Sequence, residues 1–410
     1  MRILLLAPAV AMAAAASIPS AHAEATASAS FRETVSQVQA RIAAGDLTGA
    51  MGYAGALTPS SPLEKYMAAS LSMEIAAKRN DIVAQRKAIA EMIESGAAPE
   101  GQLGYLNRVA GFLSYQTGAI DNAVVYLTRA RSLGEASPQT SLMLAEAYVR
   151  QRKLPEAAQV VNETIAAQKA AGQAVPATWY DRAASLARAR KDWASLAEAS
   201  AAKLSQGGMA GPDWRSGIMT YVEAANPEPE AKLDLLRLEA ATGAMASERD
   251  YQAYATLAAN QGYAAEGKAV VEAGLSSQKL GSGDPVAATL MRTLRSKAIV
   301  NLAALKPLPG KAASAASGAR AAKAGDDLLA NSQFAEAVPY YRAALEKGDV
   351  DRDRVTTRLG IALARSGDLG GAQIAFAQAT GRWKDVAAYW SAWVNARNSS
   401  VPAPAVAATN

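Results

Sequence analysis

The sequence contains no cysteine, and its one histidine is His22. Without cysteine there is no thiolate nucleophile, no disulfide and no N-terminal cysteine to carry a lipid anchor. Long apolar runs are equally scarce. Beyond the first residues, no stretch approaches the ~20 apolar residues that a membrane-spanning helix needs. We therefore expect a mature chain without a transmembrane segment.

Residues 1–23 have the layout of a secretory signal peptide. Arg2 precedes an apolar run over residues 3–16, and Ala21-His22-Ala23 forms a small-x-small cleavage site before Glu24. Cleavage there removes His22, which excludes serine–histidine and cysteine–histidine catalysis and most transition-metal sites. Carboxylate or lysine chemistry stays open in principle, but no pattern points to it. We expect a periplasmic protein that is not an enzyme and has no catalytic residue, metal site or cofactor.

The charge balance gives little support to nucleic-acid binding. Without Arg2, the 42 basic residues fall to 41 against 37 acidic ones, a formal charge of +4. This is only mildly basic for a chain of 410 residues. Alanine is abundant and only four residues are phenylalanine, a composition that favours helices packed through small contacts.

Residues 104–171 contain a helix-turn-helix pattern and then a second copy 34 residues later. The corresponding positions are Gly111, Ala123, Leu127 and Ala130 in the first copy and Ala145, Ala157, Val161 and Thr164 in the second. A fixed period of this length is typical of stacked repeat arrays. Small residues in these slots allow two antiparallel helices to cross closely.

Weaker copies of the pattern precede and follow this tandem. We predict a disordered lead-in over residues 24–30, a repeat array over 31–305, a linker over 306–317, further repeats with a capping helix over 318–397, and a disordered tail over 398–410. The linker is predicted from the break Lys306-Pro-Leu-Pro-Gly310. Well-preserved copies begin around Gly325 and Gly360.

The best-preserved units resemble the tetratricopeptide repeat (TPR). The resemblance is carried by Leu144-Ala145-x-x-Tyr148 with Ala157-x-x-x-Val161, and by Leu359-Gly360-x-x-Leu363 with Ala372-x-x-x-Phe376. Asn107, Ser141 and Thr356 stand where the consensus has tryptophan. The resemblance implies an all-α fold, a right-handed α-solenoid of about ten helix-turn-helix repeats, whose first helices line a concave groove for a protein or peptide.

If first helices line a groove, helical spacing identifies the side chains that face it. The candidate binding residues are Tyr105, Arg108, Phe112, Tyr115, Arg150, Tyr180 and Arg188. Arg365 shares the repeat slot of Arg150 and Arg188. Tyrosine and arginine are enriched in binding hot spots. Alternatively, the aromatic rings fill gaps between irregular repeats and the arginines are solvated. The paired lysine and asparagine that hold C-terminal carboxylates in some tetratricopeptide domains have no counterpart here.

Four other features have a functional and a structural interpretation, and we favour the structural one for each. Residues 262–269 almost match a phosphate-binding loop, but Ala269 replaces the required Ser or Thr. A block of basic residues between positions 292 and 323 could bind anionic lipid or an acidic protein. Trp383, Trp390 and Trp393 could stack on cell-wall sugars or cap the array. Glu228 and Glu230 have no partner that indicates acid–base catalysis. The block contains Arg292, Arg295, Lys297, Lys306, Lys311, Arg320 and Lys323.

Three functions are compatible with these patterns. The leading hypothesis is a non-enzymatic scaffold or adaptor of the bacterial cell envelope that binds a protein or peptide segment. The alternative is a periplasmic carrier of a small apolar or anionic ligand. A third hypothesis, an enzyme of cell-wall glycan metabolism that resembles the helical half of lytic transglycosylases, lacks any lysozyme-like catalytic segment.

Overall fold

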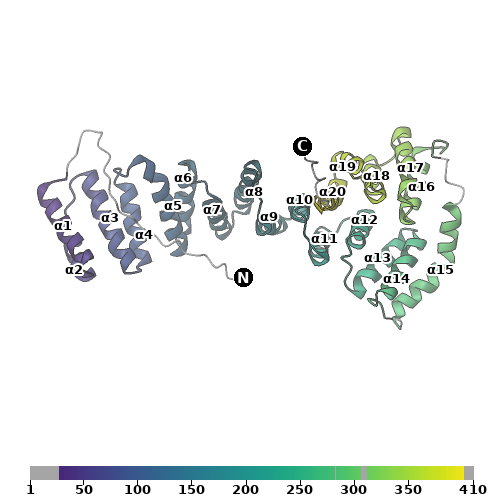
Figure 1. Cartoon of the computed structure of the whole chain (residues 1–410), viewed down its shortest axis with the longest axis horizontal. Helices are drawn as coiled ribbons and strands as arrows, with labels where there is room; N and C mark the ends of the chain where they lie inside the picture. Colours follow the sequence, from purple (N-terminus) through teal and green to yellow (C-terminus); the bar gives the residue numbers. More distant parts are fainter. Residues whose placement is uncertain (1–26, 282, 306–311, 401–410) are drawn as a thin grey trace, which may run out of the picture. The chain divides into compact units, whose positions relative to one another are not determined.

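The computed structural model describes residues 27–281, 283–305 and 312–400. Within these ranges the secondary structure consists of twenty α-helices, with no strand (Figure 1). The all-α repeat array predicted from the sequence is confirmed. None of the described helices is long and apolar enough to cross a membrane. The chain divides into two compact units, residues 1–151 and 152–410, which we call unit 1 and unit 2.

Unit 1 is built from seven described helices that follow one another in antiparallel pairs. The turns are fixed by local chemistry: Gly45 has a φ of +76°, and the Asp46 side chain accepts a hydrogen bond from the Gly49 N–H at 2.8 Å. Asp81 caps a later helix in the same way. The helices are α1 (Ala29–Ala43), α2 (Leu47–Gly55), α3 (Pro62–Lys78), α4 (Ile82–Glu94), α5 (Glu100–Gln116), α6 (Ile120–Ser132) and α7 (Pro138–Arg150).

Unit 2 holds the other thirteen described helices. The first seven are α8 (Leu154–Ala170), α9 (Ala177–Ala189), α10 (Trp193–Leu204), α11 (Gly211–Ala225), α12 (Pro229–Ala241), α13 (Glu248–Asn260) and α14 (Ala264–Ser276). The last six are α15 (Pro285–Leu305), α16 (Gly318–Ala330), α17 (Phe334–Lys347), α18 (Arg352–Ser366), α19 (Leu369–Ala377) and α20 (Trp383–Ser400).

The small residues singled out in the sequence lie at the points where paired helices cross. A Cβ added to Gly360 of α18 would lie 2.4 Å from the Phe376 ring of α19, and one added to Gly111 of α5 would lie 2.5 Å from Leu127 of α6. Both distances are far below van der Waals contact, so a larger side chain would separate the helices. The explanation of the repeat by close helix crossing is therefore confirmed.

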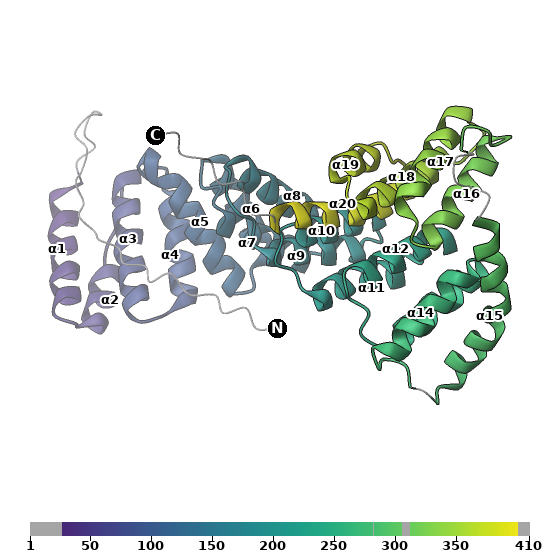
Figure 2. The same cartoon turned by 45° about the vertical axis from the view of Figure 1, so that its right-hand side comes forward.

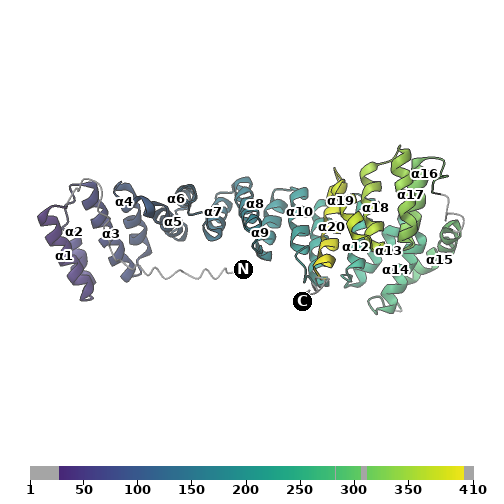
Figure 3. The same cartoon turned by 45° about the horizontal axis from the view of Figure 1, so that its top comes forward.

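The last helix, α20, does more than cover the end of the array. It packs against α18 and α19 but also against α10 and α12, which precede it by well over a hundred residues (Figures 2 and 3). Trp383, Trp390 and Trp393 are 2%, 0% and 6% exposed, which excludes them as a sugar-stacking platform. The Trp390 indole N–H donates to the Asp234 carbonyl oxygen at 3.0 Å, which ties α20 to α12.

A buried network of charged side chains joins α12 to α16 and α18. Arg358 is fully buried, with Nε 2.9 Å from Asp234 Oδ2 and Nη1 2.9 Å from Asp326 Oδ1. Asp234 also pairs with Arg237, and Asp326 with Arg354. The two arginines lower the pKa of Asp326 despite its burial. Since lone buried charges are strongly disfavoured, the network holds these helices in one arrangement.

Several sequence predictions concern residues outside the described ranges. The signal peptide at 1–23 and the Lys306-to-Gly310 break are among them, so both stay predictions. Unit 2 contains helices from both sides of that break. The lead-in predicted over 24–30 overlaps α1, which begins at Ala29, and Ala27 is already buried. The tail predicted from residue 398 overlaps α20, which ends at Ser400.

The structural interpretation of residues 262–269 is confirmed. Gly262 is a turn residue with a φ of +85°. Gly267 lies within α14, where an added Cβ would come 2.9 Å from the Ala255 carbonyl oxygen. Gly262 thus serves a turn and Gly267 a close helix contact, and residues 262–269 do not form a phosphate-binding loop. Glu228 and Glu230 form ion pairs with Arg382 and Arg354.

The basic block is described only in part. Arg292, Arg295 and Lys297 are exposed on α15, Arg320 is exposed on α16, and Lys323 pairs with Asp327. Lys306 and Lys311 lie outside the described residues. Binding of the block to anionic lipid or to an acidic protein stays a prediction.

Candidate functional site

Five of the predicted binding residues lie in unit 1. Tyr105, Arg108, Phe112 and Tyr115 belong to α5, and Arg150 ends α7. The Arg108 guanidinium carbon lies 4.9 Å from the Tyr105 ring centre, and that of Arg150 lies 4.5 Å from the Tyr115 ring centre. Arg150 of α7 thus stacks on Tyr115 of α5, and this contact joins the first helices of two neighbouring helix pairs.

The burial of these residues shows which of them pack and which are accessible. Tyr105 and Phe112 are half-buried against an apolar cluster formed by α3, α4 and α5. Arg108 pairs with Glu135 at 3.1 Å. Tyr115 is half-buried and Arg150 is exposed. Tyr105 and Phe112 therefore fill gaps between helices in part, while Tyr115 and Arg150 present an aromatic and cationic surface.

Tyr180 and Arg188 lie on α9 in unit 2. Tyr180 is only 4% exposed, and the Lys169 ammonium is 5.5 Å from its ring centre. Arg188 is exposed and lines a cavity of about 260 Å³ together with Tyr180, Ser185 and Lys203. Tyr180 is thus mainly a core residue that also lines a cavity.

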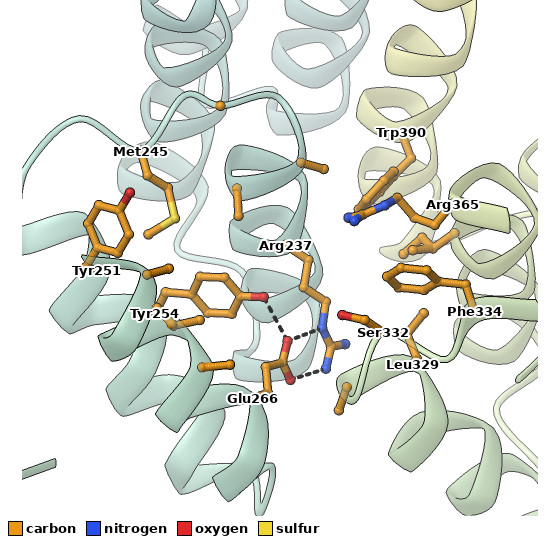
Figure 4. Close-up of a pocket in the computed structure, with 18 residues that line it drawn as sticks. Arg237, Met245, Tyr251, Tyr254, Glu266, Leu329, Ser332, Phe334, Arg365 and Trp390 are labelled. Carbon is orange, nitrogen blue, oxygen red and sulfur yellow. Dashed lines mark hydrogen bonds and ion pairs between the residues drawn. The ribbon is translucent and has the colours of Figure 1, made fainter. Parts of the chain in front are cut away.

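Aromatic and charged groups from several helices of unit 2 also converge around Arg365 (Figure 4). A cavity of about 330 Å³ lies between α12, α13 and α14 on one side and α16, α17 and α18 on the other. Tyr251, Tyr254 and Met245 line the first side, and Phe334 and Arg365 the second (Figure 4). Much of the remaining wall is apolar: Ala240, Ala241, Ala269, Val270, Ala273, Leu329, Ala330 and Ile361.

Arg365 is the unusual member of this cavity. Its guanidinium carbon lies 4.5 Å from the Phe334 ring centre. Among the described residues it has neither an ion-pair partner nor a hydrogen-bond partner, whereas Arg237, Arg354 and Arg358 each pair with a carboxylate. Burial lowers the pKa of Arg365, and the nearby Arg397 lowers it further. A half-buried guanidinium without a counter-ion leaves its donors available.

The charged groups on the opposite wall, by contrast, satisfy one another. Arg237 donates to both oxygens of Glu266, from Nε at 2.8 Å and from Nη2 at 2.7 Å. The Tyr254 hydroxyl donates to Glu266 at 2.8 Å (Figure 4). Burial and the Glu266 charge raise the pKa of Tyr254 well above its usual value, so it stays protonated. This wall therefore has no net charge to offer a ligand.

One further buried carboxylate was not predicted from the sequence. Glu239 of α12 is fully buried, and among the described residues its oxygens accept no hydrogen bond. Its nearest cation is Arg215, at 3.7 Å, which also forms a closer pair with Asp250. Burial and the Asp250 charge raise the pKa of Glu239 to about 7. A group that titrates near neutral pH is thus present despite the absence of histidine.

The sequence signals for these residues differ in strength. Arg365 was identified by its repeat slot, shared with Arg150 and Arg188, although the cavity around it was not predicted. Asp234 and Arg237 stand at the i, i+3 spacing of an ordinary surface pair, so nothing in the sequence marked them as buried. Glu239 gave no signal at all, because its burial depends on how α12 packs against α11.

The helices pair through the small and large residues of the repeat pattern, as Gly360 does with Phe376. The tetratricopeptide repeat is the family whose pattern these residues resemble. No family model matches it, and no curated protein matches its sequence. A tetratricopeptide repeat protein from Parabacteroides merdae is similar over 82% of this chain and 99% of its own, with 11% identity and a TM-score of 0.30.

Two other solved structures are similar at the same distant level. The TPR2AB domain of yeast Sti1, in a complex with pHSP90, is similar over 72% of this chain and 99% of its own, with 14% identity and a TM-score of 0.25. The structure of Naa15/Naa10 bound to HypK-THB covers 85% of this chain and 57% of its own, with 14% identity and a TM-score of 0.30. We take neither a partner nor a function from such distant likeness.

Proposed function

We propose that this chain is a non-enzymatic interaction scaffold of the bacterial cell envelope that binds a protein or peptide segment along its first helices. The observation that carries the proposal is the pairing of Tyr115 on α5 with Arg150 on α7. These are first helices of consecutive pairs and they contact each other, so the aromatic and cationic surface is continuous across a repeat boundary.

Such a surface suits an extended polypeptide. A stacked arginine loses little conformational freedom on binding and can still donate to carbonyl or carboxylate groups, while the tyrosine ring supplies apolar area. Arg108 extends the same surface along α5, held by Glu135. Export to the periplasm, through cleavage between Ala23 and Glu24, belongs to this proposal. N-terminal sequencing of the protein recovered from the periplasm tests it.

The binding surface is tested by photo-crosslinking in intact cells. A benzophenone amino acid placed at Phe112, on the proposed surface, should capture a specific partner. The same group at Val125, which is 64% exposed on α6, should not. The substitutions Arg150→Glu and Arg188→Glu should reduce the specific adducts, because they reverse the charge that the partner meets. If every specific crosslink survives both substitutions, the assignment of this surface is wrong.

A further inference from the structure

The cavity around Arg365 has a property that packing does not require. It combines one cation without a counter-ion, among the described residues, with walls that are largely apolar. A buried charge is strongly disfavoured unless it finds a partner. Every other arginine in the charged network of α12, α14, α16 and α18 has a carboxylate within 3.3 Å.

We propose that this cavity binds the carboxylate group of a small ligand whose remaining part is apolar. Arg365 would receive the carboxylate, and its planar guanidinium can donate two parallel hydrogen bonds to it. Stacking on Phe334 at 4.5 Å fixes the plane of the guanidinium and so prepares it for a two-point contact. This inference does not rest on the proposed scaffold function, because it concerns different residues in unit 2.

The shape of the cavity favours an apolar remainder. α12 and α14 contribute small side chains, Ala240, Ala241, Ala269 and Ala273, where bulkier residues would have filled the space. Leu329 and Ile361 close the opposite wall. A volume of about 330 Å³ lies at the lower end of the range for small-molecule sites. It suits one short chain or ring.

The charges that line the cavity favour a carboxylate over a phosphate. A phosphate monoester carries more than one negative charge at neutral pH, and it would need a second free cation. Arg237, the other arginine of the cavity, is already held by Glu266 and Asp234. Arg397 stacks on Trp393 at 4.7 Å and does not line the cavity. A single negative charge therefore matches the single cation that Arg365 supplies.

Calorimetric titration of the purified full chain tests the proposal. Octanoate and 3-phenylpropanoate should bind with one-to-one stoichiometry, and octanamide, which has the same length but no charge, should bind at least tenfold more weakly. The peptide N-acetyl-Ala-Ala-Leu with a free carboxylate, compared with its amidated form, shows whether a polypeptide end supplies the carboxylate. Octyl phosphate tests whether the cavity prefers a carboxylate to a phosphate.

Variants locate the binding. Arg365→Met keeps the length of the side chain and should weaken octanoate roughly 10- to 100-fold, the loss expected for a charge-assisted contact. Arg365→Lys should bind at an intermediate level, because it keeps the charge without the planar fork. Arg342→Met is the control, since Arg342 is exposed on α17 and does not line the cavity, and it should bind as the unaltered chain does. Thermal melting followed by circular dichroism verifies that each variant folds.

The outcomes are distinct. Tight binding of octanoate that Arg365→Met weakens supports the site with a free acid as the source. Binding of the peptide carboxylate alone, with the same dependence on Arg365, supports it with a chain end as the source. The proposal is overturned if no probe binds, if octanamide or octyl phosphate equals or exceeds octanoate, or if a folded Arg365→Met binds unchanged.

Discussion

Arg358 should be the most costly single side chain to remove from the buried charged network. It is fully buried on α18 and lies between Asp234 of α12 and Asp326 of α16. The substitution Arg358→Met keeps a similar length and removes the charge, the donors and a cation–π contact to Trp383 at 5.6 Å. Two buried carboxylates then lose a shared partner.

The size of the loss follows from the partners that remain. Breaking a buried ion pair by removing one side costs about 3–5 kcal/mol. Asp234 keeps Arg237 at 2.5 Å, while Asp326 keeps Arg354 at 2.8 Å and the Tyr341 hydroxyl at 2.9 Å. Neither carboxylate is left alone, so we expect the lower end, about 3 kcal/mol. For a unit of this size this lowers the melting temperature by roughly 6–12 °C.

Tryptophan fluorescence reports this change selectively. The sequence has six tryptophans, and all of them lie in unit 2: Trp179, Trp193, Trp214, Trp383, Trp390 and Trp393. Denaturant titration followed by fluorescence therefore monitors unit 2 alone, while far-ultraviolet circular dichroism monitors both units. In Arg358→Met the midpoint of the fluorescence transition, which reports unit 2, should move to a lower denaturant concentration. The remaining dichroism change, which comes from unit 1, should keep its midpoint.

The matched control is Arg382→Met. Arg382 pairs with Glu228 and Asp351, but its side chain is 56% exposed, and exposed pairs contribute about 0–1 kcal/mol. A second variant, Arg358→Met with Asp234→Asn, should recover part of the stability, because Arg237 then faces Glu266 alone and the excess negative charge is gone. If Arg358→Met unfolds at the same denaturant concentration as the unaltered chain, the network does not hold unit 2 together and the reasoning fails.

Three further predictions concern stability. Ala157→Leu, at a fully buried position of α8, should cost roughly 1–3 kcal/mol by overpacking the helix crossing. Gly360→Ala should cost a similar ~1–3 kcal/mol, because its Cβ would meet the Phe376 ring at 2.4 Å. The pKa of Glu239 is about 7 in the folded chain and 4.5 as its ordinary value, so the folded state binds the extra proton and stability should fall as pH rises from about 4.5 to 7. Glu239→Gln should flatten this dependence and make the protein more stable at pH 8, by on the order of 1–2 kcal/mol.

These three predictions are checked by denaturant titrations, at pH 5 and at pH 8 for Glu239. Ala158→Ser serves as a control for Ala157→Leu, because it lies next to the crossing and adds only a hydroxyl. An Ala157→Leu or Gly360→Ala protein as stable as the unaltered chain would show that the helices can separate without loss. Equal pH dependence in Glu239→Gln and the unaltered chain would show that another group titrates.

The sequence predicted the helical repeat well because that information is local. Turn residues such as Gly45 and Asp46, and small residues such as Ala157 and Gly360, determine where helices begin, end and cross. These features depend on neighbours within one or two repeats.

The candidate sites were predicted only in part, because their chemistry depends on long-range packing. The repeat slot identified Arg150, Arg188 and Arg365 equally, yet Arg150 is stacked on Tyr115, Arg188 is exposed beside one cavity, and Arg365 is stacked on Phe334 in another. Arg365 alone of the three is half-buried, and that is decided by helices far apart in the sequence. The burial of Glu239 likewise depends on long-range packing, and it introduces a group that titrates near neutral pH although residues 24–410 contain no histidine.

The position of α20 has a consequence for the order in which unit 2 can fold. In an ordinary repeat array each repeat contacts only its neighbours, so folding can start at one end and spread. Here the hydrogen bond from Trp390 to Asp234 joins residues that are 156 positions apart. The faces of α10 and α12 that pack against α20 stay uncovered until residues 383–400 have been synthesised. Closing so long a loop slows folding. During synthesis, unit 1 can complete its contacts early, whereas unit 2 must wait for the end of the chain.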